Sequence, residues 1–223
     1  MSLLKRFMSR LPNRWQTELK RINFGRQIHN GRFLTAEPEF KILHELISTG
    51  DWVVDIGANV GHYTKRFSEL VGTEGRVIAI EPVPTTFSLL SANVQLFKHP
   101  NVTLINAAIS DKLEVVGMSI PKFSSGLNNY YQAHVSAVTD SALTVLTLSL
   151  DSLSNEHPIA LVKIDAEGHE SFVLAGMSDL IERYHPILIV ETGSSDVIAN
   201  LASRGYEPEK MKNSPNVLFR PTM

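Results

Sequence analysis

A glycine-rich turn around Asp55 has the residue types and spacing of a ligand-binding site. A short apolar run that contains Asp55 is followed by Gly57 and Gly61, and residues 63–71 then carry apolar side chains at helical spacing. The first glycine permits a sharp turn, and the second lets a helix lie close to the strand and to a ligand. We therefore expect a strand, a turn and a helix with Asn59 as its N-cap. Ligands bind at such turns, beside the helix N-terminus.

Two acidic residues restrict the chemistry of the expected ligand. Asp55 stands where dinucleotide-binding strands usually carry glycine, and its carboxylate would repel a pyrophosphate but attract a cation. Glu81 follows a second apolar run, residues 76–80, where a carboxylate can accept both hydroxyls of a ribose. S-adenosylmethionine combines an ammonium, a sulfonium and a ribose, so it is the expected cofactor. Asp55 as a capping residue and Glu81 as a helix N-terminal charge are the simpler alternatives.

A third strand, residues 102–105, leads to Asn106. Its amide carries a donor and an acceptor, as needed to contact the edge of an adenine. The alternative is that Asn106 only forms a turn.

A fourth apolar run, residues 159–164, contains Lys163 and leads into an acidic segment at Asp165. Burying Lys163 is costly unless the ammonium is paired, and side chains two residues apart in a strand share a face. We therefore expect Lys163 to pair with a carboxylate near the cofactor.

The remaining patterns indicate an α/β fold. One helix is expected over residues 35–50, with Thr35 as its N-cap, and another over 196–203. A fifth strand is expected over 186–190, and a closing strand over 216–219. Residues 111–150 break this rhythm and predict an inserted hairpin or flap, which either carries substrate contacts or is a solvated loop. We expect one α/β domain over 35–223, which contains these strands and helices, and a basic helical extension or lid over 1–34.

The composition excludes several classes of site and partner. The 223 residues contain no cysteine, which excludes disulfides, thiolate zinc sites and cysteine nucleophiles. The formal net charge of −2 gives no whole-protein case for nucleic-acid binding. Neither a membrane span nor a secretory signal is evident, so a cytoplasmic location is expected.

The basic residues gather near the N-terminus. Residues 1–32 carry a formal charge of +7, and the remainder carries −9. Apolar residues at helical spacing predict short helices over 2–11 and around Trp15, Leu19 and Ile22. These helices are interpreted either as a lid with solvated cations or as a segment that weakly contacts an anionic membrane surface or an anionic substrate.

Four motifs resemble the FkbM family of class I S-adenosylmethionine-dependent methyltransferases. They are Val54-Asp55-Ile56-Gly57-Ala58-Asn59-Val60-Gly61, Glu81-Pro82, Leu150-Asp151-Ser152-Leu153 and Lys163-Ile164-Asp165-Ala166-Glu167-Gly168-His169-Glu170. The resemblance implies a Rossmann-like, seven-stranded, mostly parallel sheet with one antiparallel strand and helices on both faces. It also implies methyl transfer to a hydroxyl of a sugar, glycan or natural product.

The resemblance also assigns cofactor contacts. It places Asp55, Gly57 and Gly61 around the methionine end of the cofactor, with Asn59 in the same turn and Glu81 on the ribose. It places Asn106 and Ala107 at the adenine, and Asp165 to Glu170 opposite the methyl group and the acceptor.

The acidic segment supplies three candidates for the base that removes the acceptor proton: Asp165, Glu167 and His169. A Mg²⁺ ion held by Asp165 and Glu191 is an alternative, although no metal site is predicted. The competing functions are a nicotinamide-dependent oxidoreductase, a cofactor-binding protein without catalysis, and a protein or nucleic-acid methyltransferase. The sequence predicts neither the acceptor nor the oligomeric state.

Overall fold

The computed structural model describes residues 12–123, 128–141, 143–153 and 157–222. The helix expected over residues 2–11 lies outside these ranges, as do residues 124–127 of the expected flap. Across the described residues, no helix is both long and apolar enough to cross a membrane.

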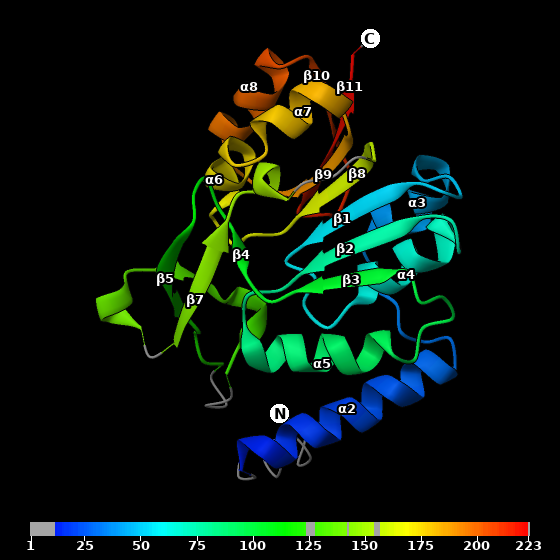
Figure 1. The fold of residues 1–223 in the computed structure, drawn as a ribbon, viewed down its shortest axis with the longest axis vertical. Helices are drawn as coiled ribbons and strands as arrows, with labels where there is room; N and C mark the ends of the chain where they lie inside the picture. The colour runs from blue at the N-terminus through cyan, green and yellow to red at the C-terminus, as the bar shows by residue number, and fades with distance from the viewer. Residues whose placement is uncertain (1–11, 124–127, 142, 154–156, 223) are drawn as a thin grey trace.

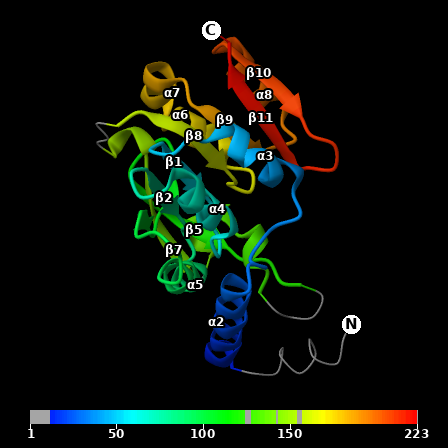
Figure 2. The ribbon, with the colours of Figure 1, turned by 90° about the vertical axis from the view of Figure 1, so that its right-hand side faces the viewer.

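A seven-stranded sheet forms the centre of the molecule, with helices on both faces (Figures 1 and 2). Its strand order is β10-β11-β9-β8-β1-β2-β3, and β11 runs antiparallel to both of its neighbours whereas the other pairs are parallel. The strands are β1 (Trp52–Ile56), β2 (Arg76–Ile80), β3 (Val102–Ile105), β8 (Ile159–Ile164), β9 (Ile187–Glu191), β10 (Tyr206–Lys210) and β11 (Asn216–Pro221). The predicted Rossmann-like sheet with one antiparallel strand is confirmed.

Both faces of the sheet are buried, which explains the nearly continuous apolar runs in its central strands. One face is covered by α3 (Pro38–Leu46), α4 (His62–Val71) and α5 (Pro84–Val94), and the other by α6 (Glu170–Ala175), α7 (Ser178–Tyr184) and α8 (Ser195–Ser203). In β1, Val53 packs with α3 and α4, whereas Val54 and Ile56 pack in the opposite core. Because side chains alternate, Asp55 shares the α4 face with Val53.

Two helices begin later than the sequence predicted. The helix expected over residues 35–50 is α3, which starts at Pro38 with Glu37 as N-cap, because proline suits the first turn of a helix. Helix α4 starts at His62 with Gly61 as N-cap, so the assignment of Asn59 as N-cap is wrong. The turn takes left-handed conformations at Asn59 (φ 51°) and Gly61 (φ 98°), which delays the helix.

The inserted segment forms a second, four-stranded sheet of order β4-β7-β5-β6, larger than the predicted hairpin. Its strands are β4 (Ala108–Ile109), β5 (Glu114–Ser119), β6 (His134–Ser136) and β7 (Leu143–Leu148). The predicted hairpin corresponds to the antiparallel pair β5–β7. The second sheet stands beside the carboxyl ends of β1 and β2 (Figure 1).

The N-terminal helix α2 (Asn13–His29) lies along α5, outside the sheet layers (Figures 1 and 2). Phe24 and Ile28 attach it to a small apolar cluster that includes Leu89 of α5. Trp15, Leu19 and Ile22 instead remain 54%, 42% and 52% exposed. The helix therefore packs on the domain through residues other than the apolar stripe seen in the sequence.

Candidate functional site

The turn after β1 lies directly against the segment that follows β8. A Cβ atom on Gly57 would come within 2.0 Å of the Asp165 carbonyl oxygen, and Gly57 has a φ of 74°. The backbone N–H of Asp165 donates to the Ile56 carbonyl at 3.1 Å, and that of Gly57 donates to Ile80 at 3.0 Å. These contacts hold the ends of β1, β2 and β8 together, and they require a residue without a side chain at position 57.

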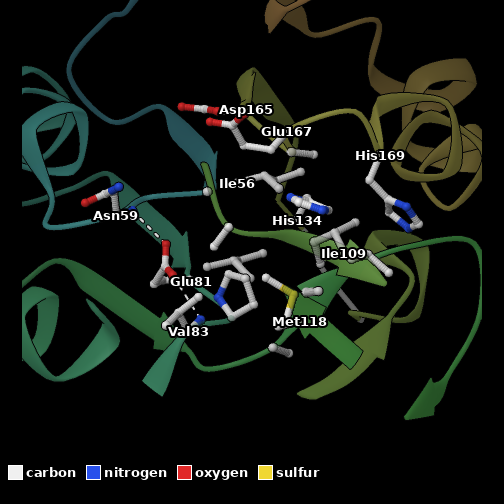
Figure 3. A pocket seen from close by; sticks show the side chains of 18 of the residues that line it. Ile56, Asn59, Glu81, Val83, Ile109, Met118, His134, Asp165, Glu167 and His169 are labelled. Atoms are coloured by element: carbon white, nitrogen blue, oxygen red, sulfur yellow. Dashed lines mark hydrogen bonds between the residues drawn. The ribbon is translucent and has the colours of Figure 1, made fainter. Parts of the chain in front are cut away.

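Glu81 is fixed at the end of β2 by two main-chain donors. Its Oε2 accepts from the N–H of Asn59 at 3.0 Å, and its Oε1 accepts from the N–H of Val83 at 2.9 Å (Figure 3). The side chain is only 5% exposed. Burial raises its pKa to about 7, although the two N–H groups oppose this shift. Each oxygen keeps a lone pair for a further donor, such as a ribose hydroxyl.

Asp55, Lys163 and Asp165 form a charged group at the ends of β1 and β8. Lys163 is 4% exposed, and its Nζ lies 3.1 Å from Asp165 Oδ2 and 4.8 Å from the centre of the Tyr63 ring. Burial lowers the pKa of Lys163, but the carboxylates of Asp165 and Asp55 outweigh that effect and raise it. The predicted pairing of Lys163 with a carboxylate is confirmed.

Asp55 itself is almost completely buried, at 1% exposure. Its Oδ2 accepts from the Thr64 hydroxyl at 2.6 Å, whereas its Oδ1 is buried without a hydrogen-bond partner. Burial raises the pKa of Asp55. An unpaired buried carboxylate oxygen is costly, so this position favours a ligand that brings a donor or a positive charge.

More carboxylates surround this group on the α3 and α4 face of the sheet. The Tyr63 hydroxyl donates to Glu37 and to Glu39, and the Asn216 amide also donates to Glu39, whose second oxygen is buried without a partner. Burial, followed by repulsion from Asp165, raises the pKa of Glu191 to about 7. Lys163 is the buried ammonium paired with these acids, which outnumber it, so the region fits a cationic ligand.

A pocket opens at the carboxyl ends of β1, β2 and β8 and is closed by the second sheet (Figure 3). Seven of the residues predicted from the sequence line it: Gly57, Asn59, Glu81, Ala107, Asp165, Glu167 and His169. The second sheet and the segment before β6 add Met118, Tyr130, Ala133, His134 and Val135, which the sequence did not identify. The only signal for them was the expectation that the insert carries ligand contacts.

Three predicted cofactor residues do not line this pocket. Asp55 lies behind the turn, and Gly61 is the N-cap of α4, where a Cβ atom would lie 2.8 Å from Leu90. The Asn106 amide donates to the backbone carbonyls of Glu81 at 2.8 Å and Pro82 at 3.0 Å. This geometry supports a turn-forming role for Asn106, and an adenine contact by it stays a prediction.

The three candidate bases have different surroundings. Asp165 is paired with Lys163, whereas Glu167 is more exposed, adopts a φ of 49°, and points into the pocket near His134 (Figure 3). Burial, followed by the charge of Asp165, raises the pKa of Glu167. His169 bonds to the Ser110 hydroxyl through Nε2 at 2.9 Å and stacks on Phe172, and burial lowers its pKa.

The proposed alternative of a carboxylate-bound metal has limited geometric support. Asp165 follows β8 and Glu191 ends the neighbouring strand β9, as expected. Within the described ranges, however, no three His, Asp or Glu side chains converge closely enough to hold a metal ion.

Comparisons with known proteins find a matching family model, a related sequence and a similar solved structure. The family model "Methyltransferase FkbM domain" matches residues 55–208, which include the turn, Glu81 and the acidic segment. Hexuronic acid methyltransferase AglP of Haloferax volcanii is 27% identical over 152 residues, covering 67% of this chain and 59% of AglP. The crystal structure of methyltransferase FkbM from Methylobacillus flagellatus superposes with a TM-score of 0.56 at 14% identity, covering 81% of this chain and 50% of that one. The chain thus spans only half to three fifths of these relatives.

Proposed function

Because this chain belongs to the FkbM methyltransferase family, we propose that it transfers a methyl group from S-adenosylmethionine to a hydroxyl of a sugar, glycan or related natural product. The observation that carries the proposal is the pocket at the strand ends, which Glu81 and Asp165 line and behind which Asp55 is buried with an unpaired oxygen. The sugar class is supported by the hexuronic acid in the name of the relative AglP. The cytoplasmic location expected from the sequence is part of the same proposal.

The residues of the pocket fit S-adenosylmethionine part by part. Glu81 can accept the ribose hydroxyls through the lone pairs that its two backbone bonds leave free. The acid-rich group around Asp55 and Asp165 favours the cationic methionine end. Val83, Ala107 and Met118 give the pocket an apolar wall that suits an adenine.

The chemistry asked of the protein is modest, because S-adenosylmethionine supplies an already activated methyl group. The chain must align the acceptor oxygen with that methyl group and accept its proton. Glu167 is the candidate base that points into the pocket, and its raised pKa makes it a better proton acceptor than an ordinary glutamate. Asp165, held by Lys163, can position the acceptor or share the proton, and His169 remains a third candidate.

The first test is calorimetric titration of the full chain with S-adenosylmethionine and with NAD. We expect saturable binding of S-adenosylmethionine and no binding of NAD, because the carboxylates at the turn repel a pyrophosphate. Binding of NAD alone would instead support a nicotinamide-dependent oxidoreductase.

The second test separates an enzyme from a cofactor-binding protein without catalysis. The full chain is incubated with methyl-labelled S-adenosylmethionine and a panel of sugars, nucleotide sugars and glycans. Label in an alkali-stable ether product is expected, since a methyl ester would hydrolyse and an ether would not. Cofactor binding without transfer to any acceptor in the panel would contradict the proposed function.

A further inference from the structure

A second depression adjoins the cofactor pocket on the side away from the second sheet. It has a volume of about 600 Å³ and is formed by the segments after β8 and β9 and by the β10–β11 hairpin. Glu167 lines both this groove and the cofactor pocket. The two spaces therefore meet beside a candidate base.

The position of this groove makes it the natural place for an acceptor. The second sheet closes the pocket beside Val83 and Ala107, where the adenine is proposed to lie. On the opposite side, Glu167 is shared by the linings of the pocket and the groove. An acceptor must approach the methyl group from a direction that the cofactor itself leaves open.

The side chains that line the groove give it an acidic character. Glu167, Glu170 and Glu191 contribute carboxylates, and Lys210 is an exposed ammonium on β10. Glu170 is only 7% exposed, and its Oε1 accepts from the Gly168 N–H at 2.9 Å. Burial, followed by repulsion from Asp165 and then from Glu167, raises the pKa of Glu191, as expected where negative charges are crowded. A further carboxylate would increase that repulsion.

A buried amide supplies independent evidence that the groove needs donors. Asn216 lines the groove, is 3% exposed, and faces Glu191 across the β9–β11 pair. Its nitrogen donates to Glu39, but its Oδ1 is buried without a hydrogen-bond partner. This oxygen is an acceptor, so a ligand that satisfies it must bring an N–H or O–H group.

We propose that this groove selects an acceptor sugar that carries an ammonium group, an amino sugar, and rejects a sugar that carries a carboxylate. The inference rests on the proposed methyl transfer to a sugar and narrows its substrate class. The ammonium is recognised by Glu191 and its neighbouring carboxylates, and the ring hydroxyls supply the remaining donors. A uronic acid would instead add an unpaired anion among these carboxylates, and the repulsion would disfavour its binding.

Binding can be tested without relying on turnover. The full chain, saturated with S-adenosylhomocysteine, is titrated at about pH 7 with methyl glucosaminide, methyl glucoside and methyl glucuronide, which share one ring geometry. We expect the glucosaminide to bind at least about tenfold more tightly than the glucuronide, with the glucoside between them. Equal or tighter binding of the glucuronide overturns the inference, and so does binding of none of the three.

A paired substitution tests whether the groove is responsible. Glu191→Gln keeps the shape of the side chain and removes its charge, so the preference for the glucosaminide should fall to less than about threefold. Glu207→Gln, an exposed position on β10, serves as the matched control and should keep the full preference. The affinity for S-adenosylhomocysteine reports that each variant is folded. An unchanged preference in Glu191→Gln overturns the assignment.

Methylation of the same three sugars separates this inference from the proposed function. Tight binding of the glucosaminide without methylation of any sugar supports the groove and contradicts the methyltransferase proposal. Preferential methylation of the glucuronide supports the methyltransferase proposal and overturns the selectivity argued here.

Discussion

The residue that the proposed chemistry depends on most is Asp165, because it connects three parts of the site. Its carboxylate pairs with Lys163, its backbone packs against Gly57, and its side chain lines the cofactor pocket. Asp165 thus contributes both to the packing of the strand ends and to the charge of the site. Few single side chains in the chain carry both roles, so its substitution gives the most direct test of the proposed mechanism.

We expect Asp165→Ala to lower methyl transfer by at least about 100-fold, the range found when a group that handles the acceptor proton is removed. Asp165→Asn keeps a hydrogen-bond acceptor for buried Lys163, so it should preserve the fold while losing most of the activity. Circular dichroism and thermal unfolding check the fold, and initial rates check transfer. Asp179→Asn, an exposed position in α7, is the matched control. Near-normal turnover in Asp165→Ala would remove this residue from the mechanism.

Glu81 links the stability of the folded chain to pH. Its pKa is about 7 in the folded chain, against an ordinary value of 4.5. The folded state therefore holds a proton that the unfolded state releases, so its stabilising contribution is present below about pH 4.5 and is lost as the pH rises through 7. Glu81→Gln stays neutral at every pH and escapes this loss.

We therefore expect the free energy of unfolding of Glu81→Gln, relative to that of the unchanged chain, to be about 2–3 kcal/mol higher at about pH 8 than near pH 4.5. A pH-independent cost is superimposed, because the Gln amide nitrogen must face one of the two backbone N–H groups that donate to Glu81. The same variant should bind S-adenosylmethionine much more weakly, because one acceptor oxygen is replaced by a donor amide. Urea unfolding at both pH values and calorimetric titration measure the two effects. The same stability difference between variant and unchanged chain at both pH values would contradict the argued cost of burying the carboxylate.

At the scale of elements, the turn between β1 and α4 depends on close backbone approach. Gly57→Ala would combine a positive φ with a Cβ atom that meets the Asp165 carbonyl, so we expect a loss of more than about 2 kcal/mol of stability and of cofactor binding. Gly50→Ala has a φ of 93° but no atom within 4 Å of the new Cβ atom. It should cost only the backbone strain, about 1 kcal/mol, and retain binding. Chemical unfolding and calorimetry of the two variants distinguish packing from strain, and equal effects would argue against the contact.

The central strands could be predicted because burial on both faces leaves a simple trace in the sequence. Residues 76–80 and 159–164 are apolar almost throughout, and an acidic residue directly follows each run. The second sheet leaves no such trace. Val115 and Leu146, in β5 and β7, are 59% and 47% exposed, so the apolar pattern there does not mark an inner face. Strand β6 is only three residues long, below the length at which alternation is informative.

The predictable part of the candidate site lies in the segments that follow the strand ends. The predicted residues Gly57, Glu81 and Asp165 line the pocket because the ends of parallel strands meet at one edge. His134 and Tyr130 line it because of how the second sheet packs, which local sequence does not encode. Similarly, Glu39 and Asn216 are 177 positions apart in the chain and share a hydrogen bond. Their contribution to the acid-rich group could not be anticipated.

At the scale of the whole molecule, the distribution of charge and of apolar surface sets α2 apart. The inner face of α2 packs through Phe24 and Ile28, and Lys20 lies 5.3 Å from the centre of the Tyr130 ring, beside the cofactor pocket. Its outer face presents Trp15 and Ile22, more than half exposed, together with Leu19, at positions that align along one side of the helix. Such an apolar stripe is unusual on an exposed helix and requires an explanation.

We propose that this face of α2 contacts an anionic membrane surface, as one interpretation of the sequence suggested. The +7 charge of residues 1–32 complements anionic headgroups, and a tryptophan with aliphatic neighbours suits the interfacial layer. The full chain should therefore co-sediment with vesicles that contain phosphatidylserine, bind pure phosphatidylcholine vesicles weakly, and dissociate as salt is added.

Replacing Trp15, Leu19 and Ile22 together with serine should reduce binding at least about tenfold while leaving the thermal midpoint nearly unchanged, since all three side chains are exposed. Serine at Leu113, Val115 and Leu146 removes equally exposed apolar side chains from the second sheet and should leave binding intact. Equal binding of both triple variants, or equal binding to neutral vesicles, would show that the stripe on α2 is not a membrane-contact surface.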